Sequence, residues 1–316
     1  MTAIYIRNGF YGSGDVFSDN IYLDNNGTTQ MCCEALKEYV NGTKLGNASG
    51  SYADKAKQII DDSDSLIRKW TSSPDYRIIY TSGATESNNT IIRAMIDARS
   101  PDKVNEMNPM NKVNEMNEMK PHIIVSAIEH SSLLECCRKI RNKIDITVVQ
   151  PNMYGLIDAD AVASAIRPNT VLISVMHINN ETGAVNDIQK IAERIKSINP
   201  ALVFHVDIVQ SFGKFPVQLE TAGIDAASVS YHKFGGPVGL GALIVSPRVF
   251  EIIQNNPLLA GEQNVGARGG TMNLPGISAG LAALQTTIEN RMEKNRKLRG
   301  MKMIILNKLA EQYDVG

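Results

Sequence analysis

The chain has 316 residues, of which 43% are hydrophobic and 21% are charged, so it can bury a large core like an ordinary globular protein. Its 32 basic and 33 acidic residues give a formal net charge of −1, which favours neither a nucleic acid nor an anionic membrane as a partner. The amino terminus lacks the apolar segment of a signal peptide, and no later segment is apolar for long enough to span a membrane. We therefore expect a cytoplasmic protein.

The first hundred residues predict two helices, followed by a buried strand and a third helix. Thr28 and Thr29 can cap the first helix, because hydroxyl side chains accept hydrogen bonds from the free amides of a helix start. The second helix carries apolar residues at helical spacing. The expected elements are a lead-in, a short strand, a helix, a helix, a strand and a helix, at residues 1–20, 21–24, 28–40, 52–70, 77–80 and 85–98.

The buried strand at 77–80 leads directly into Thr-Ser-Gly-Ala-Thr-Glu-Ser at 81–87. A strand, a turn of small residues and a helix start form an anion site in outline, because free amides and the helix dipole point at the same place. Phosphate would be the natural ligand. An ordinary capped turn fits the same seven residues.

Residues 100–120 interrupt the pattern. The hexapeptide Lys-Val-Asn-Glu-Met-Asn occurs at 103–108 and again at 112–117, and it is polar without any packing periodicity. We expect this segment to be a surface insertion without a role of its own.

From residue 122 onward, predicted strands and helices alternate, which is typical of a mostly parallel sheet with helices on both faces. A final long helix is expected from Ile277 to about Gln312, with a break near Gly300. The predicted strands are 122–127, 144–149, 171–176, 202–206, 227–231 and 241–245, and the predicted helices between them are 131–141, 158–166 and 187–198.

Two reactive side chains follow neighbouring predicted strands. Asp207 comes directly after the strand at 202–206, and Lys233 follows the strand at 227–231. Open α/β sheets build their sites at the carboxyl ends of the strands. Pyridoxal phosphate requires an acid for its ring nitrogen and an amine for its Schiff base, so this pair suggests that cofactor.

Eight motifs in one order make the sequence similar to the NifS/IscS type of cysteine desulfurase, within the class V aminotransferases. The resemblance covers residues 21 to 275, and its motifs are Tyr-Leu-Asp-x-x-x-Thr-Thr at 22–29, Gly-Asn-x-Ser at 46–49, Thr-Ser-Gly-Ala-Thr-Glu-Ser at 81–87, Glu-His at 129–130, Met-His-x-Asn-Asn-Glu-x-Gly at 176–183, His-Val-Asp-x-x-Gln-Ser-x-Gly-Lys at 205–214, Ser-x-His-Lys at 230–233 and Arg-x-Gly-Thr at 268–271. It implies an α/β fold of fold type I, with a mostly parallel seven-stranded sheet.

The same resemblance implies a domain plan. Residues 21–275 would form the domain that binds pyridoxal 5'-phosphate, and residues 276–316 a long helix that leads toward a small domain. In this family the small domain carries a nucleophilic cysteine and a carboxylate-binding arginine. We expect that domain to be truncated or absent here.

The resemblance assigns roles around the cofactor ring. It implies that Lys233 forms the Schiff base and moves protons at the substrate carbon, and that His130 lies over the ring face. Asp207 would pair with the ring nitrogen. Gln210 and Asn180 would lie beside the phenolic oxygen.

Other matching residues are implied for the phosphate. Ala84, Thr85, Ser230 and His232 would hold it, and Thr271 would reach the phosphate of a neighbouring subunit. The last match implies a homodimer with shared sites.

The implied reaction converts L-cysteine, or a close analogue, to L-alanine with sulfur transfer to an acceptor protein. The four cysteines stand in two adjacent pairs, Cys32-Cys33 and Cys136-Cys137, a spacing that suits neither a disulfide scaffold nor a zinc site. We expect free, packed thiols in a reducing compartment, none of them the sulfur carrier, and no metal. Two alternatives remain open: an interaction protein that binds the cofactor without desulfurating cysteine, and another lyase or aminotransferase activity of class V.

Overall fold

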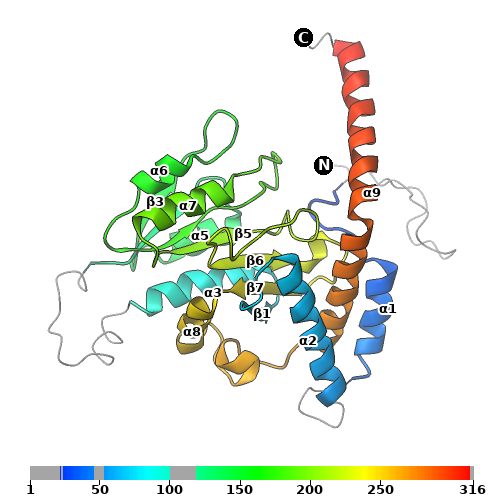
Figure 1. Cartoon of the computed structure of the whole chain (residues 1–316), viewed down its shortest axis with the longest axis horizontal. Coiled ribbons are helices and arrows are strands. Elements are labelled where there is room, and N and C mark those ends of the chain that lie inside the picture. Colours follow the sequence, from blue (N-terminus) through cyan, green and yellow to red (C-terminus); the bar gives the residue numbers. More distant parts are fainter. Residues whose placement is uncertain (1–21, 23, 46–52, 100–118, 314–316) are drawn as a thin grey trace.

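The computed structural model describes residues 22, 24–45, 53–99 and 119–313 (Figure 1). The expected lead-in at 1–20, the Gly-Asn-x-Ser motif at 46–49 and the repeat at 103–117 lie outside the described residues.

The described residues contain a seven-stranded sheet in the order β1-β7-β6-β5-β4-β2-β3. Each strand is five residues long, and six of the seven point in one direction. Within the described residues only β7 runs the other way, because it pairs antiparallel with both β1 and β6. The predicted mostly parallel sheet is therefore confirmed. The strands are β1 (Arg77–Thr81), β2 (His122–Ser126), β3 (Asp145–Val149), β4 (Thr170–Ser174), β5 (Val203–Asp207), β6 (Ala226–Ser230) and β7 (Gly241–Val245).

Helices cover both faces of the sheet, as the alternating pattern predicted. Successive strand residues point to opposite faces, so Ile123 and Ile124 of β2 belong to different core clusters. Ile123 packs in the cluster of α3, α5 and α8, whereas Ile124 packs in the cluster of α1, α2, α6, α7 and α9. The helices are α1 (Cys33–Gly42), α2 (Ala53–Trp70), α3 (Ala84–Asp97), α5 (Ser131–Lys139), α6 (Ala159–Ser164), α7 (Ile188–Ile198), α8 (Pro247–Asn255) and α9 (Leu274–Tyr313).

The start of the first helix was predicted wrongly. Helix α1 begins at Cys33, and its N-cap Cys32 makes no capping bond with its side chain. The hydroxyl groups of Thr28 and Thr29 bond instead to residues near the end of β6, so they are not available as caps. The predicted strand at 21–24 is also not observed where it can be checked, since Tyr22 and Asp24 lie outside any strand.

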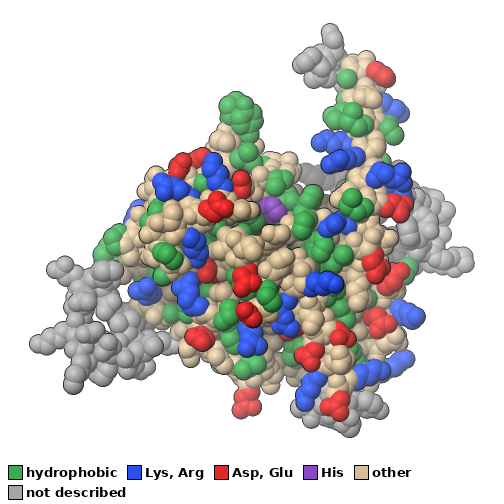
Figure 2. Space-filling model, viewed as in Figure 1, with side chains coloured by type: hydrophobic (Ala, Val, Ile, Leu, Met, Phe, Trp, Pro, Cys, Tyr) green, Lys and Arg blue, Asp and Glu red, His purple; other side chains and the backbone are tan. Residues whose placement is uncertain are grey.

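The last helix is continuous, so the predicted break near Gly300 is wrong. A single glycine inside a helix costs only about 1 kcal/mol, which the long runs of helix-forming residues on either side offset. Helix α9 packs against α1 and α2 and then extends beyond them (Figure 1). Figure 2 shows apolar side chains along this projecting part, where Met292, Leu298 and Ile305 are exposed.

Two features were not predicted from the sequence. Helix α8 follows β7 directly and has proline in its first turn, where the missing amide hydrogen costs nothing. A 3₁₀ turn, η2 (Tyr231–Lys233), follows β6. No helix in the described ranges is long and apolar enough to cross a membrane.

Candidate functional site

Six strands bring their carboxyl ends to one edge of the sheet, and five of them lead into predicted site residues. Because β1, β2, β4, β5 and β6 point the same way, the segments that follow them meet there. The predicted site residues on these segments are Ala84 and Thr85 after β1, His130 after β2, Asn180 after β4, Asp207 and Gln210 at β5, and Ser230, His232 and Lys233 at β6.

Asp207 is the last residue of β5 and is 5% exposed. Its Oδ2 accepts a hydrogen bond from Nδ2 of Asn88 at 3.3 Å, and its Oδ1 accepts one from the amide of Val209 at 3.0 Å. Burial raises the pKa of this carboxyl above its ordinary value, although both hydrogen bonds and the charge of Lys233 act in the other direction. Both hydrogen-bond donors are neutral, so the carboxylate can still accept a cationic partner.

Lys233 ends the 3₁₀ turn η2, directly after β6. Its Nζ donates hydrogen bonds to the carbonyl oxygens of Asn26 at 2.8 Å and Gly27 at 2.7 Å. Partial burial lowers the pKa of the Lys233 amine, and the negative charges of Asp24 and Asp207 oppose this shift. A lysine with a lowered pKa has a larger neutral fraction, and the neutral amine is the nucleophile.

The turn at residues 25–27 closes over Lys233. The hydroxyl of Thr29 bonds to the carbonyl of Lys233 at 3.0 Å, and the hydroxyl of Thr28 bonds to Nδ1 of His232 at 3.1 Å. The amide of Thr29 also donates to the carbonyl of His232 at 2.8 Å. Three hydrogen bonds thus hold the segment before α1 against the residues that follow β6.

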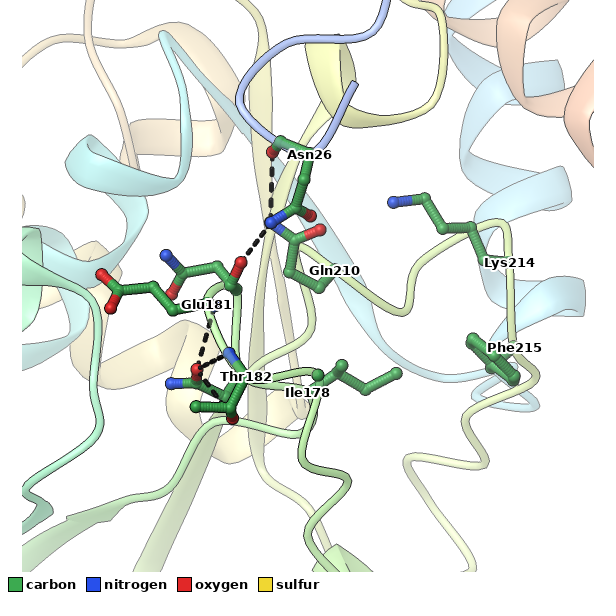
Figure 3. A pocket seen from close by; sticks show the side chains of 10 residues that line it. Asn26, Ile178, Glu181, Thr182, Gln210, Lys214 and Phe215 are labelled. Carbon is green, nitrogen blue, oxygen red and sulfur yellow. Dashed lines mark hydrogen bonds between the residues drawn. The ribbon is translucent and has the colours of Figure 1, made fainter. Parts of the chain in front are cut away.

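Gln210 and Asn180 meet at the same turn. The side chain of Gln210 donates to the carbonyl of Asn26 at 3.4 Å, and the side chain of Asn26 donates to the carbonyl of Asn180. These three residues line a cavity of about 330 Å³, with Lys214 and Phe215 on another side of it (Figure 3). Polar amide groups therefore line this cavity, and one of its lining residues, Asn26, also accepts a hydrogen bond from Lys233.

His130 is the N-cap of α5 and is exposed to solvent. Its Nδ1 accepts a hydrogen bond from the amide of Ser132 at 3.1 Å and lies 2.8 Å from the hydroxyl of Ser132. Since Nδ1 is an acceptor, the proton of the neutral ring is on Nε2. The hydroxyl of Ser132 in turn accepts from Nδ2 of Asn88, so one amide connects His130 to Asp207.

The start of α3 faces the end of β6. The first amides of α3, beginning at Ala84, have no acceptor inside the helix. A Cβ atom added to Gly241 would lie 2.4 Å from Cα of Gly83, so only glycine allows this close approach. A Cβ atom on Gly83 would lie 3.8 Å from Oγ of the buried Ser230. Free amides and a hydroxyl group therefore converge as an anion site requires.

An ion pair between Arg268 and Glu86 stabilises the turn between β1 and α3. Arg268 bonds both carboxylate oxygens of Glu86, at 2.9 and 3.3 Å, and the second oxygen also accepts from the amide of Ser82 at 2.8 Å. Burial alone would raise the pKa of Glu86, but the hydrogen bonds with Arg268 and Ser82 outweigh it and lower the pKa. Glu86 therefore stays ionised and fixes the turn.

The structure separates one predicted residue from the others. Thr271 is exposed on the segment between η3 (Gln263–Gly266) and α9, and within the described residues no hydrogen bond joins it to the other candidates. Its predicted contact with a neighbouring subunit stays a prediction.

Several residues at the site were not predicted from the sequence as functional. Asn26, Thr28, Thr29 and Arg268 all lie inside motifs that carried the family resemblance, so the motifs did contain the signal. Asn88 lies one residue beyond its motif. The sequence gives no indication that its partner is Asp207, because 119 residues separate the two.

Comparisons with known proteins agree with the fold and the motifs. The family described as Aminotransferase class-V matches residues 21–312. Two curated relatives are "Putative cysteine desulfurase NifS" of Bacillus subtilis (strain 168), 35% identical over 88% of this chain and 67% of the relative, and "Cysteine desulfurase IscS" of Rickettsia prowazekii (strain Madrid E), 34% identical over 87% of this chain and 63% of the relative. The chain thus spans about two thirds of the length of these relatives.

Solved structures give the same result. A "NIFS-LIKE PROTEIN" superposes with a TM-score of 0.78 at 28% identity, covering 91% of this chain and 74% of that chain. "SspA in complex with cysteine" superposes with a TM-score of 0.72 at 32% identity, covering 84% of this chain and 72% of that chain. The predicted fold is confirmed, and the chain belongs to the class-V aminotransferase family, in which it is similar to the NifS/IscS cysteine desulfurases.

Proposed function

We propose that this chain binds pyridoxal 5'-phosphate at the sheet edge and carries out cysteine desulfurase chemistry on L-cysteine or a close analogue. The arrangement of Lys233 and Asp207 carries the proposal, because an amine with a lowered pKa and a buried carboxylate lie at the carboxyl ends of adjacent strands of the sheet. Relatives named as cysteine desulfurases match most of the chain, which supports the choice of reaction.

The groups of the cofactor fit the residues present. The amine of Lys233 would form the Schiff base with the aldehyde carbon of the cofactor. Asp207 has only neutral hydrogen-bond donors, so a protonated ring nitrogen would supply the cation that its buried carboxylate lacks. Gln210 and Asn180 would lie beside the phenolic oxygen, at the cavity that they line.

The phosphate would lie at the start of α3. The free amides at Ala84 and Thr85 offer hydrogen bonds, and Ser230, whose Oγ would lie 3.8 Å from a Cβ atom on Gly83, and His232 would complete the phosphate site. When bound, the cofactor withdraws electrons from the substrate α-carbon. Lys233 would move the proton at that carbon, and the imidazole of His130 would cover the ring face and could donate from Nε2.

We further propose a homodimer in which Thr271 reaches the phosphate of the neighbouring site. The exposure of Thr271 on the segment before α9 supports this, because an exposed side chain is accessible to a second chain. Sulfur would pass to an acceptor protein. The cytoplasm is the proposed location, in line with four cysteines that are all free.

The experiment is reconstitution of the purified chain with pyridoxal 5'-phosphate. We expect a visible absorption band that Lys233→Ala abolishes, and release of sulfide and L-alanine from L-cysteine. Lys190→Ala removes an exposed lysine from α7 and should leave the band unchanged. Absence of a band in the unmodified chain would refute the proposal. A band without sulfide release would instead favour a protein that binds the cofactor without desulfuration, or another class V activity, which a screen of amino acids for spectral changes would identify.

A further inference from the structure

The tight turn of residues 24–27, which we call the strap, joins the cavity to the amine of Lys233. Asn26 lines the cavity, whereas Lys233 is not among the described residues that line it. The carbonyl oxygens of Asn26 and Gly27 accept hydrogen bonds from Nζ of Lys233, at 2.8 and 2.7 Å. The nitrogen of a Schiff base keeps at most one hydrogen, so at least one of these bonds has to break when an aldehyde reacts there. The strap and an aldehyde therefore compete for the same nitrogen.

The strap is a closed unit of backbone. The amides of Gly27 and Thr28 both donate to the carbonyl of Asp24, at 3.0 and 3.1 Å. A Cβ atom on Gly27 would lie 2.4 Å from Oδ2 of Asp24, so the turn is this tight only with glycine at that position. The two carbonyl groups that bind Lys233 therefore leave the amine only when the whole turn moves.

The strap is anchored at its base and exposed at its tip. At the base, the amide and the hydroxyl of Thr29 bond two backbone carbonyl groups of η2, at 2.8 and 3.0 Å. At the tip, the exposed Asn26 donates from Nδ2 to the carbonyl of Asn180 and accepts a bond of 3.4 Å from Gln210 (Figure 3). Both partners line the cavity and follow other strands of the sheet. Loss of these two bonds would free the tip while the base stays in place.

We propose that the strap closes the cavity over the amine of Lys233 and opens when Asn26 releases Asn180. The strap rests on these contacts, whereas pyridoxal 5'-phosphate as the aldehyde that passes it rests on the proposed function. The bond between Asn26 and Asn180 is not consumed when Lys233 reacts, so it can form again after a ligand has entered. The strap thus controls how fast a ligand enters and leaves, and it affects the equilibrium little.

The first test needs no cofactor. Competitive labelling with a trace of acetic anhydride, read by peptide mass spectrometry, measures how fast each lysine reacts as the neutral amine. Asn26→Ala removes the side-chain bond to Asn180 and keeps both backbone carbonyl groups. Loss of one hydrogen bond should speed the acetylation of Lys233 about three- to tenfold. The exposed Lys190 of α7 should react at an unchanged rate.

The matched control is Asn169→Ala. Nδ2 of Asn169 also donates to a backbone carbonyl, that of Lys120 at 2.7 Å, but it does so just before the start of β4, at the opposite end of that strand from Asn180. Its loss removes the same kind of bond away from the cavity. The rate at Lys233 should therefore stay as in the unmodified chain, and equal acceleration in both variants would overturn the proposal.

The pH profile of labelling separates an opening strap from a shifted pKa of Lys233. A change of pKa moves the midpoint of the profile, whereas more frequent opening raises the limiting rate that is reached when the amine is fully neutral. We expect the limiting rate to rise in Asn26→Ala. Asn26→Asp keeps the size of the side chain but places an acceptor against the carbonyl of Asn180, so its limiting rate should rise as well. Unchanged limiting rates in both variants would refute the strap.

The second test follows the binding of pyridoxal 5'-phosphate by stopped-flow absorbance. Asn26→Ala should raise the association and dissociation rate constants by the same factor, about three- to tenfold, and keep the Kd within about twofold. A higher Kd without faster association would instead make Asn26 an ordinary ligand contact and would contradict the proposal.

The two tests fail independently of each other. If the cofactor gives no visible band, the proposed function fails, while faster acetylation of Lys233 in Asn26→Ala would still support the strap. A visible band with unchanged acetylation would support the proposed function and remove the strap. Thermal unfolding checks that each variant folds.

Discussion

Asn88 donates a hydrogen bond from Nδ2 to Oδ2 of Asp207 across 3.3 Å. The same nitrogen lies 3.0 Å from the hydroxyl of Ser132, which in turn contacts Nδ1 of His130. One buried amide of α3 therefore orients both the carboxylate proposed for the ring nitrogen and the imidazole proposed for the ring face.

Asn88→Ala should weaken the binding of pyridoxal 5'-phosphate about ten- to hundredfold, because a hydrogen bond to a charged group contributes roughly 1.5 to 3 kcal/mol. Without this donor, burial would raise the pKa of Asp207 further. The carboxyl group would then be protonated more often and would pair less well with a protonated ring nitrogen. Spectral titration of the cofactor measures the change.

Asn186→Ala is the control for the loss of a buried asparagine. Asn186 is 2% exposed and bonds the backbone of Met176 and Ile157, not Asp207. We expect it to lower stability without a comparable loss of cofactor affinity. Equal losses of affinity in both variants would mean that Asn88 acts only through the fold.

Glu129→Gln should change the pH dependence of stability. Oε1 of Glu129 accepts from the amide of Met176 at 2.6 Å and from the hydroxyl of Ser126, while its Oε2 has no partner in the described residues. Burial, together with the negative charge of Asp207, raises the pKa of Glu129 to about 8, against the hydrogen bonds from Ser126 and Met176. A raised pKa means that the folded protein holds the proton more tightly than the unfolded chain. Its stabilising contribution is therefore complete below the ordinary pKa and is lost as pH rises through 8.

Between pH 6 and pH 9 the unmodified chain should lose on the order of 2 kcal/mol more unfolding free energy than Glu129→Gln, whose side chain does not titrate. Denaturant unfolding at both pH values measures the difference. Glu135→Gln, at an exposed position in the following helix, should keep the slope of the unmodified chain. Parallel curves for all three proteins would contradict the prediction.

The site was predictable where its signal is local in the chain. Asp207 and Lys233 each follow an apolar run, so a strand end and a reactive side chain could be recognised together. Thr28 and Thr29 show where this reasoning fails. Next to a helical pattern they look like caps, but their hydroxyl groups bond residues 204 positions away. A local rule cannot detect such a partner.

The fold, too, was predictable where the signal is local and not where it depends on distant residues. Alternating strands and helices predicted the sheet and its two covering layers, because that pattern follows from burial on both faces. The direction of β7 could not be predicted, since its five apolar residues, Gly-Ala-Leu-Ile-Val, carry no local signal of strand direction. The predicted break at Gly300 failed because glycine alone does not end a helix.

Alanine substitutions at two glycines of α9 should change the stability of the protein in opposite directions. A Cβ atom on Gly280 would lie 2.6 Å from the ring of the buried Tyr231, whereas one on Gly300 would meet nothing within 4 Å. Gly280→Ala should therefore destabilise the protein by about 1 to 3 kcal/mol through overpacking. Gly300→Ala should stabilise α9 by about 0.5 to 1 kcal/mol, because alanine restricts the unfolded chain. Thermal unfolding with circular dichroism measures both, and two changes of the same sign would contradict the packing described here.

The position of β7 between β1 and β6 also determines when the site can assemble during synthesis. The turn after β1 and the segment that carries Lys233 are adjacent only when residues 241–245 are in place between their strands. A ribosome must therefore have translated past Val245 before the two halves of the site can join. Long-range pairing of this kind is slow to form. Nascent chains shorter than this should not capture the proposed cofactor, and its loading would be a late event in the maturation of the protein.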